Sequence, residues 1–263
     1  MSKCEKPARA EHSGSFRIDV SPGVAIPDWS VVTSMAVGDA LKAIFETCNW
    51  SNRWQGLSEA EWHTRCSILK TYARTGHAPS LNLLATATGI SRENLQPLVM
   101  QLAARDIVVV DEDGYSIIGA YPFVDSMTEH RVQLDDVMVN AMCAIDALGA
   151  GAMLGRDTTI KSSCRCCGAS VCIQTKKQGT ALADFSPADI VIWAGIQYEN
   201  NCAAHSLCTT MAFFCSSAHL KSWLASHPSK PSGYGLSLEE GFQLGKAIFM
   251  PLLTGGKEAT VFS

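Results

Sequence analysis

A helical pattern of apolar residues surrounds the run Asn140–Asp146 and narrows the possible folds of this chain more than any other stretch. The apolar residues recur at three- and four-residue steps, as on one face of a helix: Leu134, Val137, Met138, Met142, Ile145 and Leu148. Polar residues fall between them, and Gly149 and Gly151 follow as a stop signal. The pattern predicts one mostly apolar helix over residues 134–148, on which a Cys and an Asp would be partly buried.

Within that run, Cys143 and Asp146 are three residues apart and are expected on one helix face. Burial favours the neutral forms of both side chains, so the carboxyl can hold a proton near neutral pH, while a soft cation nearby favours the thiolate. This pairing suggests soft-metal binding coupled to proton transfer. The alternative is a structural pair, with Cys143 as a small hydrophobe and Asp146 as a hydrogen-bonded core acid.

Composition narrows the class of protein. The chain has 263 residues, 47% of them hydrophobic, which is enough for one large domain or two small ones. A net charge of −4 with 17% charged residues does not indicate nucleic acid or an anionic membrane as a partner. No long apolar run or secretory signal is evident, so we expect a cytoplasmic protein with no membrane span. Eleven cysteines, an odd number, favour reduced thiols with metal or redox chemistry over a disulfide framework.

The first 120 residues are expected to form two parts. Residues 1–55 read as a loose arm (1–30) followed by a packing helix over 33–48. Residues 56–120 read as a winged helix-turn-helix-like module, because three helices precede a hairpin: 58–75, 80–88 and 91–105, then 107–110 with 115–118.

A winged helix usually binds DNA, but the charges argue against that use here. The segment in the recognition position, residues 92–105, offers only two cations, contains Pro97 and is followed by an acidic wing. A phosphate-binding surface needs several clustered Lys or Arg. We therefore expect no nucleic-acid partner.

Residues 121–263 predict a mainly antiparallel sheet domain packed with helices, which makes the fold class α+β. A connector over 121–131 leads into it. Strands and helices follow from the β-branched runs and the capping signals: strands at 156–163, 170–175, 190–193 and 209–214, and helices at 219–226 and 237–249, with a frayed tail after Pro251.

Several further cysteines leave three readings open: Cys164, Cys166, Cys167, Cys172, Cys202, Cys208 and Cys215. Tetrahedral zinc usually takes two pairs of ligands, of which Cys164-x-x-Cys167 is one, with Cys202 or Cys215 available to complete a site after folding. The other readings are a thiol relay for a soft ion, and inert thiols. His205 and His219 are read as ordinary surface or core histidines.

The order and spacing of several motifs resemble those of the alkylmercury lyase (organomercurial lyase, MerB) family over roughly residues 55–250. They are Tyr121-Pro-Phe, Glu129-His-Arg, Cys143-Ala-Ile-Asp146-Ala-Leu, Ser163-Cys164 followed by Gly168-Ala169, and Leu207-Cys208 with Phe213-Phe214. The resemblance implies that the winged-helix module is structural and that residues 121–263 are catalytic.

The resemblance also implies the reaction: protonolysis of a carbon–mercury bond to a hydrocarbon and Hg(II), in mercury detoxification. Cys143 and Cys208 are then the mercury ligands, and Asp146 is the proton carrier and a further ligand. No organic cofactor is needed; external thiols act as reductant and Hg(II) acceptor, Hg(II) is the bound product, and a mercuric reductase is the implied partner. Of the extra cysteines, only the one matching Cys164 recurs in the family, where it is taken as structural.

Two points stay open beside this reading. Family members often have an aromatic residue where Met142 precedes the catalytic cysteine, so its thioether is expected near the pocket and bears on substrate range. The alternative function is a non-enzymatic soft-metal sensor, with the winged helix as its output and the Cys164–Cys172 cluster as its input. The oligomeric state is not predicted.

Overall fold

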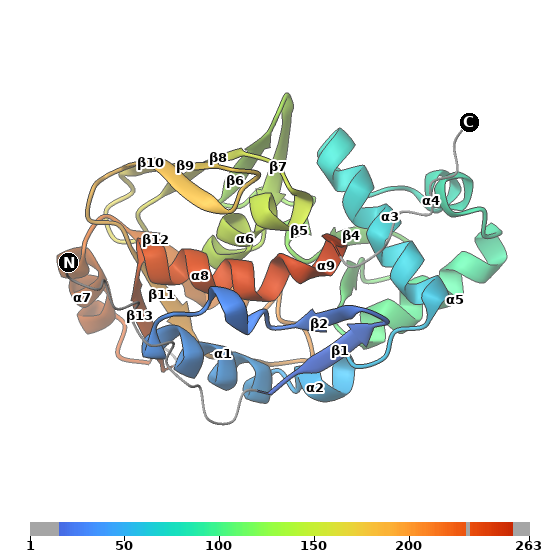
Figure 1. The fold of residues 1–263 in the computed structure, drawn as a ribbon, viewed down its shortest axis with the longest axis horizontal. Helices are drawn as coiled ribbons and strands as arrows, with labels where there is room; N and C mark the ends of the chain where they lie inside the picture. The colour runs from blue at the N-terminus through green and yellow to red at the C-terminus, as the bar shows by residue number, and fades with distance from the viewer. Residues whose placement is uncertain (1–15, 230–231, 255–263) are drawn as a thin grey trace, which may run out of the picture.

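The computed structural model describes residues 16–229 and 232–254. One long antiparallel sheet, in the order β10-β9-β8-β6-β7-β5-β4-β3, runs along the molecule (Figure 1). Its strands are β3 (Val108–Val110), β4 (Ile117–Ala120), β5 (Phe123–Val124), β6 (Arg131–Leu134), β7 (Val137–Ala141), β8 (Thr158–Ser163), β9 (Ser170–Lys176) and β10 (Ala181–Ser186). Together with the helices this confirms the predicted α+β class.

A second, three-stranded antiparallel sheet has the order β12-β11-β13. Its strands are β11 (Val191–Gly195), β12 (Met211–Phe214) and β13 (Gly233–Ser237). The strands predicted near 190–193 and 209–214 are confirmed, whereas β13 lies between the two predicted helices, where no strand was predicted.

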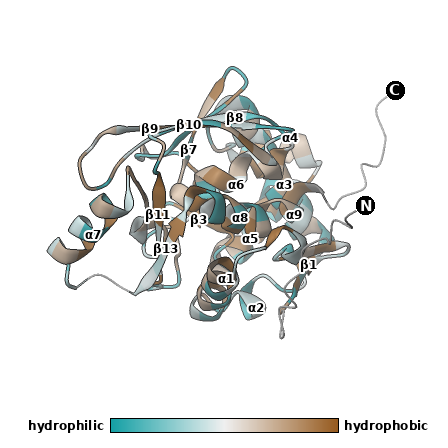
Figure 2. Cartoon of the chain, turned by 60° about the vertical axis from the view of Figure 1, so that its left-hand side comes forward, coloured by the Kyte–Doolittle hydropathy of each residue, from teal (hydrophilic) through white to brown (hydrophobic). Residues whose placement is uncertain are grey.

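The helix α6 (Ala144–Leu154) lies at the centre of the molecule and is buried along almost its whole length. It packs against α8 (Leu238–Phe249), and the hydropathy colouring shows α6 as strongly apolar (Figure 2). A Cβ on Gly149 would lie 2.7 Å from the carbonyl oxygen of Gly245, so this glycine pair lets the two backbones touch. Gly149 and Gly151 therefore permit close packing and do not end the helix, which Gly155 terminates in a left-handed conformation.

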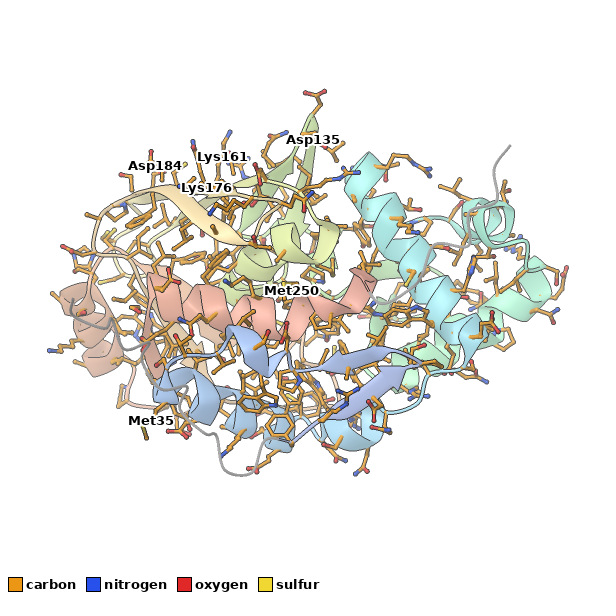
Figure 3. All side chains as sticks on the ribbon, viewed as in Figure 1. Met35, Asp135, Lys161, Lys176, Asp184 and Met250 are labelled. Atoms are coloured by element: carbon orange, nitrogen blue, oxygen red, sulfur yellow. The ribbon has the colours of Figure 1, made fainter. Side chains whose placement is uncertain are left out.

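The helix predicted over residues 134–148 is wrong in its first half. Residues 131–141 form the β6–β7 hairpin, whose register pairs Leu134 with Val137 across a tight turn at Asp135 (φ +50°). Figure 3 shows Asp135 at the tip of this hairpin. Val132, Leu134, Val139 and Ala141 are buried with a period of two along the strands, whereas Val137 and Met138, which the helical pattern placed on its apolar face, are half-buried.

The loose arm predicted for residues 1–30 is also partly wrong. Residues 1–15 lie outside the described residues, but β1 (Ile18–Ser21) and β2 (Val24–Ile26) form a hairpin with buried apolar side chains. A 3-10 turn, η1 (Trp29–Val31), follows it. The predicted packing helix is confirmed as α1 (Met35–Thr47), followed by the short α2 (Trp50–Arg53).

The three helices and the hairpin predicted before residue 120 are confirmed. They are α3 (Glu59–Thr75), α4 (Leu81–Thr88) and α5 (Arg92–Ala104), followed by β3 paired with β4. Ser58 and Glu61 form the expected capping box at the start of α3. β4 pairs with β5, and β5 with β7, so one sheet runs across the proposed boundary at residue 120.

The C-terminal helices lie where the sequence predicts them, as α7 (Ser217–Ser226) and α8. The stretch after Met250 begins with the short helix α9 (Pro251–Thr254), in place of the expected frayed tail, and residues 255–263 lie outside the described part. Lys161, Lys176 and Asp184 are exposed along the outer face of β8–β10 (Figure 3). Within the described residues, no helix has both the length and the apolarity needed to cross a membrane.

Candidate metal and proton-transfer site

Cys143 occupies the N-cap position of α6, and not a position inside a helix. Its backbone is extended (φ −152°, ψ 179°), and its Sγ accepts a hydrogen bond of 3.3 Å from the backbone N–H of Asp146. Cys143-x-x-Asp146 thus has the spacing of a capping box, with sulfur in the place of the usual hydroxyl. The end of β7 and the start of α6 together aim this thiol toward the interior.

Asp146 and Cys208 complete a compact group with Cys143. One ligand atom from each of the three lies within 4.8 Å of the others, and the Cys208 thiol donates to Asp146 Oδ2 at 3.4 Å. The three residues are only 2%, 3% and 4% exposed in chain order. The structure therefore brings together all three side chains that the sequence reading selected.

Burial controls the protonation of this group. Desolvation raises the pKa of Asp146 from its ordinary value near 3.8 to about 7, against hydrogen bonds from the two thiols that lower it. Desolvation likewise raises the pKa of Cys143, and the hydrogen bond with Cys143, together with burial, raises that of Cys208. At neutral pH the group consequently holds protons that a soft cation can displace from sulfur.

The three side chains line a small, apolar cavity of about 20 Å³, room for roughly one water molecule. Its remaining walls are almost wholly hydrophobic: Ile44, Trp50, Trp54, Tyr121, Ile145, Ala203, Leu207, Met211, Ile248 and Phe249. A charge that develops in such a dry space is weakly screened, so the ligands and the acid act on it strongly.

A buried network holds the loop that carries Cys208. Asp106, two residues after α5, accepts hydrogen bonds from the hydroxyls of Tyr121 (2.8 Å) and Tyr198 (2.9 Å) and from the backbone N–H of Ala203 (3.0 Å). The Tyr121 hydroxyl accepts in turn from the N–H of Ala204 at 2.8 Å. The loop before Cys208 is therefore fastened to the winged-helix-like module through a carboxylate that the sequence reading did not single out.

The sequence reading also missed the side chains that enclose the pocket. Trp50 and Trp54 from the N-terminal region line it, although the sequence predicted only a loose arm and a packing helix within residues 1–55. The thioether near the thiols belongs to Met211, whose Sδ lies 3.7 Å from Cys143 Sγ. Met142 is not among the lining residues; its methyl group packs at Gly119. In the sequence, the two tryptophans at positions 50 and 54 were the signal that could have indicated an apolar pocket wall here.

The remaining cysteines separate into two sets. Cys164, Cys167 and Cys215 gather with His219 into a second group whose ligand atoms lie within 4.8 Å of one another. In the part of the chain that the structure describes, Cys166, Cys172 and Cys202 belong to neither group. The ten cysteines described are free thiols.

The fold and the pocket define a class: an α+β protein in which two thiols and one carboxyl converge in a dry cavity suited to a soft metal. The alkylmercury lyase (MerB) family model matches residues 123–250, which contain all three of these side chains. The alkylmercury lyase of Bacillus cereus is 26% identical over 198 residues, covering 75% of this chain and 85% of that protein. That of Staphylococcus epidermidis is 28% identical over 188 residues, covering 72% and 82%.

A solved structure gives the same result for the fold. The crystal structure of the mercury-bound form of MerB2 is 26% identical in sequence and superposes with a TM-score of 0.63. The match covers 81% of this chain and 99% of that chain. In sequence and in fold, the chain is therefore similar to the alkylmercury lyases.

Proposed function

We propose that this protein is an organomercurial lyase that cleaves the carbon–mercury bond of alkyl- or aryl-mercury compounds by protonolysis. The observation that carries the proposal is the contact of two buried thiols with a carboxyl whose pKa lies near 7. Soft thiolates are the ligands that mercury prefers, and a general acid works best when its pKa is close to the working pH.

The reaction begins with ligand exchange. The organomercurial R–Hg–X exchanges X⁻ for the sulfur of Cys143, and the Cys143 thiol proton leaves with X⁻ as HX. The Cys208 thiol, which donates to Asp146 Oδ2, passes its proton to the carboxylate as its sulfur bonds to mercury. The second sulfur adds electron density to mercury and weakens the bond to carbon.

Asp146 then delivers its proton to the carbon. The electron pair of the carbon–mercury bond forms the new C–H bond, so R–H leaves and Hg(II) stays bound to the two sulfurs. No oxidation state changes in this sequence, and no organic cofactor takes part. We propose that small external thiols then remove Hg(II), in a cytoplasmic setting, and that a mercuric reductase receives it.

The closed cavity bears on how substrate enters. Room for about one water molecule does not hold an organic group, so the apolar wall must move for substrate to bind. Ile44, Trp50 and Trp54 belong to α1, α2 and the residue after α2, and they are the part of this wall that comes from the N-terminal region. We propose that this wall contacts the organic group of the substrate.

The sensor alternative receives no added support from the described surface of the winged-helix-like module. Arg105, one of its two cations, is occupied internally: it donates to the carbonyl oxygens of Arg53 (2.7 Å) and Gln55 (2.6 Å) and pairs with Glu61 at 3.3 Å. We therefore retain the expectation that nucleic acid is not a partner.

The test is a direct product measurement. The purified protein is incubated with phenylmercuric acetate and an excess of a small thiol, and benzene is measured by gas chromatography. We expect benzene from the native protein and none above background from Asp146→Ala. Stoichiometric mercury binding without benzene from the native protein would overturn the proposal in favour of a soft-metal binder.

A further inference from the structure

A second group of metal-ligating side chains lies outside the catalytic pocket. The ligand atoms of Cys164, Cys167, Cys215 and His219 lie within 4.8 Å of one another. They come from three separate segments: the turn between β8 and β9, the residue after β12, and the first turn of α7. Only the fold brings them together, because Cys167 and Cys215 are 48 residues apart.

The distances within this group fit tetrahedral zinc. Cys167 Sγ lies 3.9 Å from Cys215 Sγ, and Cys164 Sγ lies 3.5 Å from His219 Nδ1. Zinc–sulfur bonds of about 2.3 Å and zinc–nitrogen bonds of about 2.0 Å place tetrahedral ligand atoms roughly 3.5 to 3.8 Å apart. These two distances therefore match such a site, and the other distances among the four ligand atoms are no longer than 4.8 Å.

The backbone around Cys164 is also shaped for a metal-bound sulfur. The segment Cys164-x-x-Cys167-Gly168 closes a tight turn, with Gly168 at φ +73° and its N–H donating to the Cys164 carbonyl at 2.8 Å. The N–H of Cys215 donates to Cys164 Sγ at 3.3 Å, and the N–H groups of Cys166 and Cys167 also face this sulfur. Such N–H groups stabilise a coordinated thiolate and fix its orientation.

The ligand set decides which metal is favoured. Three thiolates and one imidazole form a closed tetrahedral set, with no carboxyl and no place left for a substrate. Cys164 is buried, Cys215 and His219 are half-buried, and Cys167 is exposed, so a metal ion can reach the group from solvent. We propose that Cys164, Cys167, Cys215 and His219 form a structural zinc site.

The site connects the two sheets near the catalytic loop. β12 lies between Cys208 and Cys215, so zinc fixes the far end of the segment that begins at the catalytic thiol. Arg165, in the same turn as Cys164, donates to the carbonyl oxygen of Thr209 at 2.6 Å and pairs with Glu129. Zinc therefore stabilises the position of Cys208 from a distance, and its presence does not depend on the proposed reaction.

The first test measures metal in the protein as it is purified, without chelators and before any contact with mercury. We expect about one zinc per chain by mass spectrometry of the metal, and a loss of at least about tenfold in bound zinc in Cys167→Ser and His219→Ala. The matched control is Cys166→Ser, because Cys166 is exposed in the same turn but lies outside the group. It should keep its zinc.

A second measurement tests zinc binding in the native chain, because a variant that fails to fold would lose zinc for another reason. Zinc is removed with a chelator and replaced by Co(II), whose visible absorption reports tetrahedral thiolate ligation. We expect that spectrum, and a melting temperature that falls on zinc removal and returns on reloading. The double variant Cys143→Ser, Cys208→Ser should still bind zinc, which separates this site from the pocket.

Three results would overturn the inference. One is native protein that neither contains zinc nor gives the tetrahedral Co(II) spectrum. Another is zinc that disappears in the Cys143→Ser, Cys208→Ser variant and persists in Cys167→Ser. The third is a group that takes up mercury from the reaction but no zinc beforehand.

Discussion

Both cysteine groups of this protein consist of thiols brought together by the fold, but their surroundings differ. Cys143 and Cys208 share a dry cavity with Asp146, an acid that holds a proton near neutral pH. Cys164, Cys167 and Cys215 stand with His219 in a partly exposed group that has four ligands and no acid. A metal held by two thiols beside an acid keeps positions open for a substrate and can take part in a reaction. A metal held by four protein ligands has no open position and serves a structural role. The surroundings of a thiol therefore determine its role.

The largest expected effect comes from removing a thiol of the dry group. Cys143→Ser should lower benzene release by on the order of 10³-fold or more and abolish tight mercury binding, because one sulfur cannot both displace X and activate the bond. Cys166→Ser, at an exposed thiol outside both groups, is the matched control. Near-native turnover by Cys143→Ser would contradict the assignment of the Cys143 group as the reactive one.

Removing the acid should separate binding from cleavage. Asp146→Asn keeps the shape of the side chain and leaves both thiols, so mercury binding persists while turnover falls by roughly 10²- to 10⁴-fold, the usual contribution of a general acid. Mercury binding by titration and benzene release are measured on the same sample. The exposed carboxyl of Asp184 offers the control Asp184→Asn. Equal losses of binding and turnover in Asp146→Asn would contradict the assigned role.

The raised pKa of Asp146 also predicts how stability depends on pH. The unfolded chain releases this proton near pH 3.8 and the folded chain near pH 7, so the free energy of unfolding falls between these values as pH rises. The loss is at most about 4 kcal/mol. Asp146→Asn cannot titrate, so relative to the native protein it should gain stability from pH 5 to pH 8, measured by urea unfolding. A pH-independent difference would show that the carboxyl is already ionised in the folded protein.

The smallest expected effect is at the network that holds the Cys208 loop. Tyr121→Phe removes a buried donor to Asp106 and a half-buried acceptor for the Ala204 N–H, which costs roughly 1–3 kcal/mol in the free energy of unfolding. Turnover should fall with it, and the metal content of the Cys164 group should not change. Tyr115→Phe, at an exposed tyrosine, is the control. A loss of zinc in Tyr121→Phe would mean that the two groups are not independent.

Local sequence patterns predicted a helix or strand correctly where residues close together in the chain determine its structure. The capping box at Ser58, the hairpin after α5 and the helices near residues 219 and 237 all follow from neighbours in the chain. The helix predicted over residues 134–148 is wrong in its first half because residues 131–141 pair with each other as two strands. Pairing with β5 and β8 settles that choice, and those partners are not visible locally.

The sequence by itself determined the fold class and most of the elements, and its motifs selected Cys143, Asp146 and Cys208 as candidate site residues, which the fold brings together. Only the tertiary structure decided that Cys143 is a helix cap, that tryptophans of the N-terminal region close the pocket, and that Cys215 and His219 join Cys164 and Cys167. The reason is physical. Helix and turn preferences act over a few residues, whereas the dryness of a pocket and the completeness of a ligand set depend on segments that meet only when the chain folds.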